Sequence, residues 1–294
     1  MLAGDFEQAW RESDSIQARG EPDPNRFWDG GPLREKRIII RCLHGLGDTI
    51  QFIRYVPLLR RFAAAVTVEA QPKLKTLVSQ SEIADRVITW GESEPAWDKQ
   101  IEVIELPRIF RTTLATIPRS TPYLACAETK EALLSRSQGL RVGIAWKAST
   151  FDVSRSVPIE RMATLFTVAG CSFYGLQCGP EHTELAPWLP RVSDLHTRIA
   201  TIHETAQVLR SLDLVISVDT MTAHLAGALA IPVWTLLPYE CDWRWMVERE
   251  DSPWYPTMRL FRQSAGRDWR PVIARVRKEL ARLAGQRIGN GFNR

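Results

Sequence analysis

Short runs of β-branched residues alternate with helix-like patterns along most of this chain, and the alternation occurs twice. In the first half, an apolar run at 37–43 precedes residues 49–56, whose apolar side chains recur at helical spacing. In the second half, apolar runs at 140–146 and 214–218 are each followed by a helical pattern. Strands that alternate with helices are typical of βα units in a mostly parallel sheet. The sequence therefore predicts an α/β chain with two Rossmann-like domains that face a cleft.

The same patterns predict the remaining elements and the domain limits. Further strands are expected at 66–70, 86–90, 101–106, 172–177, 232–237 and 258–263, and helices at 72–80, near 107–113, and at 158–168, 203–211, 220–230 and 271–283. The expected domains are a tail at 1–34, an N-terminal domain at 35–136, a C-terminal domain at 137–266, and a final helix and tail at 267–294. Ligands of such sheets bind at the carboxyl ends of the strands, so functional residues are expected in the loops that follow them.

Composition and chain ends exclude several classes of protein. The 38 Lys and Arg residues exceed the 34 Asp and Glu residues by four, an excess too small for a nucleic-acid protein but suited to an anionic small ligand. The five cysteines are scattered without a C-x-x-C pair, which favours a reducing cytoplasm over a disulfide framework or a zinc site. The N-terminus lacks the basic and apolar regions of a secretory signal, and no apolar run reaches the length of a membrane span.

The first candidate site follows the first strand, where Gly45-Leu46-Gly47-Asp48 opens a helix. Glycines there allow backbone N–H groups to approach a ligand, and a helix N-terminus favours negative charge. The spacing is not G-x-G-x-x-G, so dinucleotide binding is weakly supported. Asp48 either caps the helix or acts as a general base at the end of the strand.

The second candidate site is the segment 218–227, V-D-T-M-T-A-H-L-A-G. Asp219 ends an apolar strand, Thr220 and Thr222 lie in the first turn of the next helix, and His224 follows one turn later. These hydroxyls and the backbone amides of the helix start would suit a pyrophosphate. In the alternative interpretation, Asp219 is only the N-cap and His224 is a satisfied, half-buried histidine.

Four other residues are candidates for donor binding. Lys147 ends the strand that opens the second half, and Arg155 precedes a helix. Gln177 and Glu181 flank a Gly-Pro exit from another strand, where Glu181 is placed to meet a ribose or a base. The alternatives are that the basic residues are merely solvated and that Glu181 only complements a helix dipole.

Several familiar motifs do not occur in the sequence. There is no Asp-x-Asp pair to hold a metal against a diphosphate, no G-x-x-x-x-G-K-[ST] phosphate loop and no G-x-S-x-G elbow. The five histidines do not have metal-ligand spacing. We therefore expect neither a metal nor another cofactor.

A set of motifs in fixed order resembles a known group of enzymes. They are H-G-L-G-D-T-I-Q-F-I-R-Y-V-P-L-L, E-V-I-E-L-P-R, R-S-V-P, L-Q-C-G-P-E, V-D-T-M-T-A-H-L-A-G-A-L-A-I-P-V-W and D-W-R-W…D-S-P-W-Y-P-T-M-R-L-F-R-Q. They are similar to the glycosyltransferase domain that follows tetratricopeptide repeats in many bacteria, a relative of the family-nine ADP-heptose:lipopolysaccharide heptosyltransferases. The resemblance covers roughly residues 30–285, and several ordered motifs are more specific than one. Residues 4–10 resemble the remnant of a last repeat helix, although a repeat array needs about three units.

This resemblance implies a GT-B fold, with the acceptor on the N-terminal domain and a nucleotide sugar on the C-terminal domain, and an inverting, metal-independent transfer. By the same resemblance, Asp48 is the base that deprotonates the acceptor, and Arg155 contacts the leaving diphosphate. Glu181 is expected at the ribose or base. The family signature D-T-[AG]-x-x-H places Asp219, Thr220 and His224 at the diphosphate and sugar. The chain departs from that signature at Met221, whose bulk would narrow the donor pocket.

Five tryptophans gather in the last third of the chain, at positions 234, 243, 245, 254 and 269. We interpret Trp234 and Trp269 as core residues. The expected cleft wall is formed by Gly45, Gly47, Asp242, Trp243, Arg244 and Trp245.

The sequence thus predicts a cytoplasmic glycosyltransferase that uses a nucleotide-diphosphate sugar and a glycan, lipopolysaccharide or protein acceptor, without nucleic-acid partners. Two alternatives remain. One is a non-catalytic protein that binds nucleotide sugars or serves as a scaffold. The other is a GT-B epimerase that converts a nucleotide sugar without an acceptor.

Overall fold

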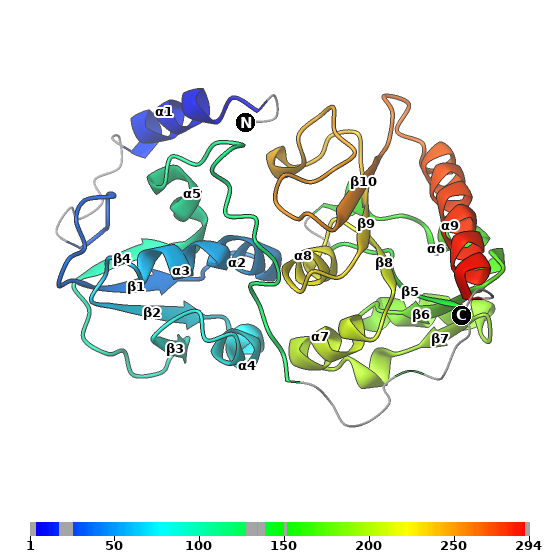
Figure 1. Ribbon diagram of the computed structural model, residues 1–294, viewed down its shortest axis with the longest axis horizontal. Coiled ribbons are helices and arrows are strands. Elements are labelled where there is room, and N and C mark those ends of the chain that lie inside the picture. Colours follow the sequence, from blue (N-terminus) through cyan, green and yellow to red (C-terminus); the bar gives the residue numbers. More distant parts are fainter. Residues whose placement is uncertain (1–3, 18–25, 128–133, 135–138, 150–151, 292–294) are drawn as a thin grey trace. The chain divides into compact units, whose positions relative to one another are not determined.

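The computed structural model describes residues 4–17, 26–127, 134, 139–149 and 152–291 (Figure 1). The chain forms two compact units. Unit 1 comprises Met1–Cys126, Asp242–Glu248 and Pro253–Tyr255, and unit 2 comprises Ala127–Cys241, Arg249–Ser252 and Pro256–Arg294. The division expected between residues 136 and 137 lies outside the described residues.

Unit 1 contains a parallel sheet in the order β3-β2-β1-β4. Its strands are β1 (Arg37–Arg41), β2 (Ala65–Ala70), β3 (Arg86–Thr89) and β4 (Lys99–Glu102). The apolar centre of β1 is completely buried, which explains why its β-branched run contains no alternation. The helices of this unit are α1 (Phe6–Gln17), α2 (Leu46–Phe52), η1 (Ile53–Tyr55), α3 (Val56–Leu59), η2 (Pro72–Leu74), α4 (Lys75–Gln80), η3 (Val103–Glu105) and α5 (Leu106–Ile109).

Unit 2 contains a larger parallel sheet in the order β10-β9-β8-β5-β6-β7. Its strands are β5 (Leu140–Ala145), β6 (Cys171–Gly175), β7 (Val192–Asp194), β8 (Leu214–Val218), β9 (Val233–Leu237) and β10 (Met258–Arg262). The helices of this unit are η4 (Val153–Arg155), α6 (Ile159–Met162), η5 (Ala163–Thr167), η6 (Pro180–Trp188), η7 (His196–Arg198), α7 (Ile202–Arg210), α8 (Met221–Ala228) and α9 (Trp269–Gly291). Val276 and Leu280 of α9 are buried in the core of this unit.

Most elements lie where the hydrophobic pattern predicts them, and two of the differences concern strands. The strand expected at 101–106 ends at Glu102, and the chain continues as η3 and then α5, where Pro107 suits the first turn. Strand β7 was not predicted, since its three residues are too short to show a period.

Two segments of the C-terminal half belong to unit 1, although the sequence placed them in the domain at 137–266. Aromatic packing accounts for this difference. The ring of Trp243, in η8 (Trp243–Trp245), stacks on Phe52 at 6.3 Å, and Trp254 contacts Phe52 edge-on at 5.8 Å. Such long-range ring contacts leave no trace in local periodicity.

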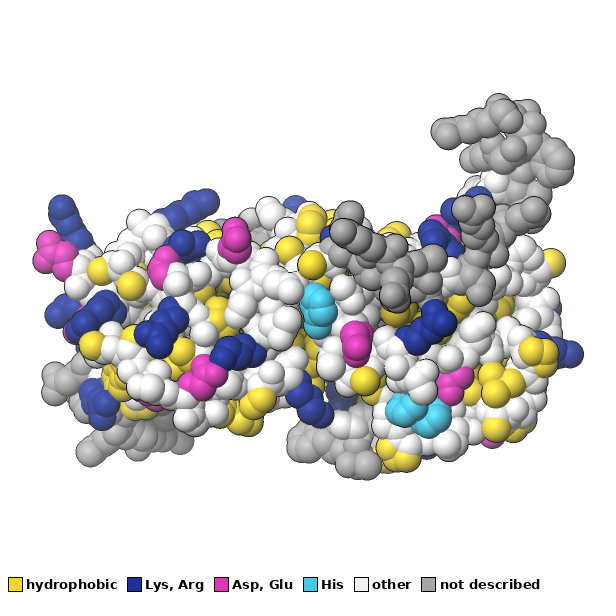
Figure 2. Space-filling view, turned by 90° about the horizontal axis from the view of Figure 1, so that it is seen from below, with side chains coloured by type: hydrophobic (Ala, Val, Ile, Leu, Met, Phe, Trp, Pro, Cys, Tyr) yellow, Lys and Arg dark blue, Asp and Glu magenta, His cyan; other side chains and the backbone are white. Residues whose placement is uncertain are grey.

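On the face shown in Figure 2, Lys and Arg side chains and Asp and Glu side chains are both scattered over the surface. Within the described part of the chain, no helix combines the length and apolar character needed to cross a membrane. No disulfide bond joins any two of the five cysteines, all of which lie among the described residues.

Candidate functional site

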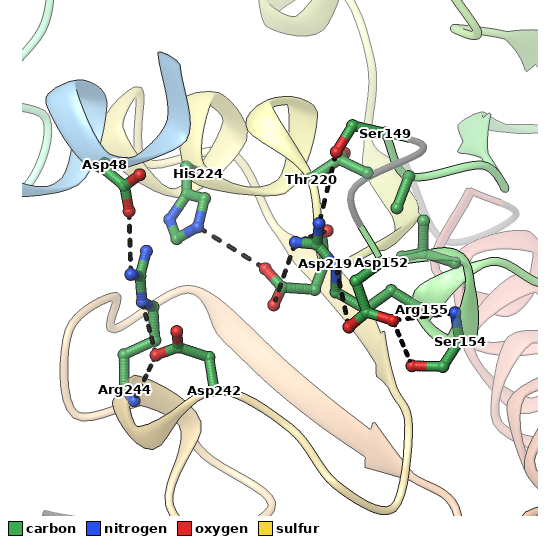
Figure 3. A network of polar contacts seen from close by, with 12 residues as sticks. Asp48, Ser149, Asp152, Ser154, Arg155, Asp219, Thr220, His224, Asp242 and Arg244 are labelled. Atoms are coloured by element: carbon green, nitrogen blue, oxygen red, sulfur yellow. Dashed lines mark hydrogen bonds and ion pairs between the residues drawn. The ribbon is translucent and has the colours of Figure 1, made fainter. Parts of the chain in front are cut away.

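Asp48 lies in the first turn of α2, just after the carboxyl end of β1. Its Oδ2 accepts the N–H of Gly45 at 3.1 Å, so the capping interpretation is correct for this oxygen. Its Oδ1 accepts from Nη2 of Arg244 at 2.8 Å (Figure 3). A Cβ at residue 45 would lie 2.9 Å from Oδ2, so glycine permits this close approach. The carboxylate is therefore fixed on both sides at the start of the helix.

Arg244 reaches Asp48 from η8, and Asp242 holds it there. The carboxylate of Asp242 accepts from the backbone N–H of Arg244 at 3.0 Å and from its Nε at 2.8 Å. The guanidinium also lies over the ring of Phe52, 5.5 Å from its centre. The guanidinium of Arg244 thus joins Asp48 and Asp242, a geometry that lysine cannot reproduce.

A cavity of about 340 Å³ lies beside these residues, entirely within unit 1. It is lined by Trp10, His44, Asp48, Phe52, Ile104, Glu105, Arg108, Trp243 and Arg244. Trp243 and Arg244 thus occupy the position expected of a wall. Trp245 does not, because it is completely buried against Tyr255.

Several residues of this cavity were not assigned from the sequence. His44 Nε2 lies 2.9 Å from Glu102 Oε1. Burial raises the pKa of Glu102, an effect that His44 partly offsets. His44 and Glu102 follow β1 and end β4, so their positions at strand ends were the available signal. Trp10 and Arg108 lie in segments that the resemblance singled out, 4–10 and E-V-I-E-L-P-R, but neither residue was given a role.

In unit 2, Asp219 follows the buried strand β8 and is itself buried. His224 is also buried, and its Nε2 lies 3.6 Å from Asp219 Oδ1 (Figure 3). The N-cap of α8 is Thr220, whose side chain accepts the N–H of Thr222 at 3.3 Å. The interpretation of Asp219 as the N-cap is therefore wrong. His224 has a polar partner in Asp219, as that interpretation expected.

Arg155 brings a positive charge to this group. Its Nη1 donates to the carbonyl oxygen of Asp219 at 3.2 Å and lies 4.0 Å from the carboxylate. Asp152 and Ser149 contact the same guanidinium at 3.6 and 3.5 Å. The sequence therefore identified three residues that the fold brings together, Arg155, Asp219 and His224.

Lys147 and Gln177 follow β5 and β6 and are joined by hydrogen bonds. Gln177 Oε1 accepts the backbone N–H groups of Trp146 and Lys147 at 3.2 and 3.0 Å. The ammonium of Lys147 pairs with Glu184, which also accepts from the indole of Trp146 at 2.8 Å. Burial alone would raise the pKa of Glu184, but Lys147 and Trp146 outweigh it and lower that pKa. The sequence did not reveal Glu184, which lies on η6.

Glu181 is the second residue of η6, directly after the turn at Gly179, where φ is +85°. The same region contains two histidine rings, His182 and His196, stacked at 3.7 Å. Nδ1 of His182 lies 2.8 Å from Asp194 at the end of β7. Among the described residues, no group of three or more His, Cys, Asp or Glu side chains is arranged to hold a metal ion.

Comparison with known proteins identifies the fold. No family model matches the chain. Protein FlbA of Caulobacter vibrioides is 25% identical over 97% of the chain, which spans only 54% of that relative's length. ADP-heptose lipopolysaccharide heptosyltransferase II of E. coli has a TM-score of 0.60 at 14% identity, over 85% of this chain and 99% of its own.

Two further structures are similar. The glycosyl transferase of family 9 from Veillonella parvula has a TM-score of 0.56 at 12% identity, over 80% of this chain and 88% of its own. The dodecameric glycosyltransferase TibC of enterotoxigenic E. coli, described as iron-containing, has a TM-score of 0.54 at 12% identity, over 76% of this chain and 63% of its own. The chain therefore has the GT-B fold of the heptosyltransferases, as the sequence predicted.

Proposed function

We propose that this chain is a heptosyltransferase-like glycosyltransferase, which moves a sugar from a nucleotide-diphosphate sugar to a hydroxyl group of an acceptor. The proposal extends to an inverting reaction without a metal ion. It is supported by the likeness in fold and by polar clusters at the strand ends of both sheets. The observation that carries it is the placement of Asp48 after β1, facing a cavity in unit 1.

In unit 1, the proposed reaction begins with the acceptor hydroxyl. The carboxylate of Asp48 takes the proton of this hydroxyl, and the oxygen then attacks the anomeric carbon of the donor sugar. The bond from that carbon to the diphosphate breaks, and its electron pair leaves with the phosphate. Attack opposite the leaving group inverts the anomeric centre. Arg244 holds the carboxylate at a fixed place for this step.

In unit 2, the proposed donor site must stabilise the negative charge that develops on the leaving phosphate. Arg155 provides the cation, and the backbone amides at the start of α8 add partial positive charge. Asp219 and His224 keep Arg155 and the helix start in place. Lys147, Gln177, Glu181, Thr220 and Thr222 complete the proposed set.

One observation favours a second candidate, a protein that binds nucleotide sugars without transferring them. Both oxygens of Asp48 already have partners, one in Arg244 and one in Gly45. An acceptor hydroxyl would have to share these oxygens with Arg244 and Gly45. A protein that only binds nucleotide sugars needs no base, and Asp48 would then serve only to cap α2 and to pair with Arg244.

ADP-heptose and other nucleotide sugars, tested for thermal stabilisation and, with a mixture of sugar acceptors present, for nucleotide release, separate the two candidates. A transferase is expected to be stabilised and to release the nucleotide, whereas a binding protein shows only the first effect. Asp48→Asn should lower turnover at least about 100-fold and leave donor affinity unchanged. Unchanged turnover would contradict the role of Asp48 as base.

Asp85→Asn is the matched control. Asp85 also lies in unit 1, pairs with Arg60 at 2.7 Å and accepts the backbone N–H of Val66 at 2.8 Å. This variant therefore loses the same kinds of bonds as Asp48→Asn, away from the cavity, and should retain full turnover.

The motifs that resemble those of transferases behind tetratricopeptide repeats support two finer proposals, an association with such repeats and a cytoplasmic location. The curated relative is nearly twice as long as the segment it shares with this chain. Sequencing the neighbouring coding region for repeat helices would test the first proposal, and fractionation of cells would test the second.

A further inference from the structure

We propose that α1 belongs to the acceptor site, where Trp10 is a specificity-determining residue that limits the acceptor to a single neutral sugar ring. The inference rests on the proposed function and deepens it. The sequence suggested only that this N-terminal helix is a remnant of a repeat. The contacts of α1 instead bring it to the cavity beside Asp48.

The indole of Trp10 is held rigidly. Its Nε1 donates to the carbonyl oxygen of Thr112 at 2.8 Å, and both residues are buried. The hydroxyl of Thr112 forms a hydrogen bond of 2.7 Å with the hydroxyl of Tyr55. Phe6, also on α1, lies 6.0 Å from Trp10, and both rings contact Trp243 edge-on, at 6.0 and 6.4 Å. Trp10 is therefore a fixed wall and not a mobile side chain.

The far end of α1 is tied to charged residues of the same cavity. Asp14 accepts from Arg108 at 2.8 Å and from Arg111 at 2.6 Å. Arg108 in turn donates to Glu105 at 2.7 Å, and both Arg108 and Glu105 line the cavity. Helix α1 thus supplies Trp10 to one wall of the cavity and, through Asp14, orients Arg108 in another.

The chemistry of the cavity indicates the kind of acceptor. Its charges are paired with each other, Asp48 with Arg244 and Glu105 with Arg108. Three aromatic side chains, Trp10, Phe52 and Trp243, line the cavity; Trp10 and Phe52 are buried, so each presents only a small part of its ring, and Trp243 is more exposed. A neutral sugar ring offers an apolar face to such rings and hydroxyls to the paired charges. At about 340 Å³, the cavity is near the lower limit of ligand pockets, about 300 Å³, so one ring fits better than a chain.

The test uses the full chain with ADP-heptose as donor and three acceptor probes: methyl glucoside, methyl glucuronide and a Ser/Thr-containing hexapeptide. Methyl glucoside should be the preferred acceptor. Trp10→Ala should raise its KM by about 10-fold or more, while the KM for ADP-heptose stays the same. Trp10→Phe, which keeps a ring, should recover most of this loss.

Trp28→Ala is the matched control. Trp28 is also a buried tryptophan of unit 1, and its Nε1 donates to a carbonyl oxygen, that of Gly31, at 2.8 Å. It does not line this cavity. Trp28→Ala should therefore leave the KM for methyl glucoside unchanged. An equal loss in this variant would mean that Trp10 acts only through stability, and the inference would fail.

A second measurement does not depend on the donor. Saturation-transfer NMR should detect binding of methyl glucoside to the wild-type protein, and Trp10→Ala or, if that variant does not fold, Trp10→Leu should weaken the signal. Preference for the glucuronide or the peptide, higher activity of Trp10→Ala, or no glucoside binding would each overturn the inference. The proposed function fails separately, if ADP-heptose neither stabilises the protein nor releases ADP.

Discussion

Arg244 and Asp48, 196 positions apart in the sequence, are joined by a 2.8 Å contact between Nη2 and Oδ1. The arginine side chain is 13% exposed and the aspartate side chain 26%, so water screens this pair only in part. Arg244 lies in the segment Asp242–Glu248, through which the C-terminal half of the sequence contributes to unit 1. The pair makes Arg244 the main positioning residue for the proposed base.

Arg244→Gln should lower kcat by about 10- to 100-fold, because the carboxylate of Asp48 loses the fork that fixes its direction. Arg244→Lys should fall between the wild type and Arg244→Gln, since an ammonium cannot hold Asp48 and Asp242 in the same way. Steady-state kinetics with saturating donor would measure both effects. Arg249→Gln, which breaks a comparable pair with Asp251 in unit 2, is the control and should retain kcat. Equal losses in Arg244→Gln and Arg249→Gln would contradict a positioning role.

The sequence was sufficient for the fold because central strands such as β1 and β8 are short and apolar and are followed by a helix. The five residues of β8 are all buried, and their apolar run predicted the strand at its observed bounds. Glycine and aspartate after β1 and the hydroxyls after β8 also gave local signals. The motifs therefore located Asp48, Asp219 and Thr220 at the ends of strands, where the structure places them.

The sequence was insufficient where a role depends on contacts between distant segments. Trp10 and Trp243 are 6.4 Å apart but belong to opposite ends of the chain. Trp245 carries the same side chain as Trp243 two positions away, yet it is completely buried, and no local pattern separates the two. Glu184 was missed because its pairing with Lys147 arises from the path of η6.

Arg54→Met should destabilise the protein by about 3–5 kcal/mol, because the buried guanidinium satisfies acceptors in three parts of unit 1. Arg54 donates to the carbonyl oxygens of Gln51 at 2.7 Å and Trp254 at 2.5 Å and to the hydroxyl of Tyr123 at 2.9 Å. Its removal leaves these buried acceptors without a donor, at about 1–3 kcal/mol each. Urea denaturation would measure the loss. Arg60→Met, at an arginine that is 40% exposed, should change the free energy of unfolding by less than about 1 kcal/mol.

Asp213 makes the stability of unit 2 dependent on pH. Burial alone would raise the pKa of this carboxyl, but hydrogen bonds from Arg141 and Arg287 lower it below 3.8. The ionised form is therefore favoured by folding. Its contribution is complete above pH 3.8 and is lost as the pH falls through the lower value of the folded state.

Asp213→Asn should therefore cost about 1.5–3 kcal/mol at neutral pH, the range for hydrogen bonds to a charged group. The difference from the wild type should shrink as the pH is lowered, because the wild-type carboxyl then becomes neutral as well. Urea denaturation over a pH series would measure this convergence. Asp251→Asn, at a side chain that is 70% exposed, should show no such trend. A difference that is constant with pH would assign the effect of Asp213 to shape rather than charge.

Lys147→Met should weaken binding of ADP-heptose by about 10-fold or more, because a lysine next to a diphosphate contributes a charge-assisted hydrogen bond. In the structure its ammonium pairs with Glu184, so donor binding has to compete with this carboxylate. Glu184→Gln removes the competing charge and should tighten binding, the opposite direction. Isothermal titration at two salt concentrations would measure the donor affinity of both variants. The affinity of the wild type should fall more with added salt than that of Lys147→Met. Lys75→Met is the control, since Lys75 forms a similarly exposed pair with Glu92 in unit 1. If Lys147→Met and Lys75→Met bind the donor equally well, Lys147 serves only to hold η6 through Glu184.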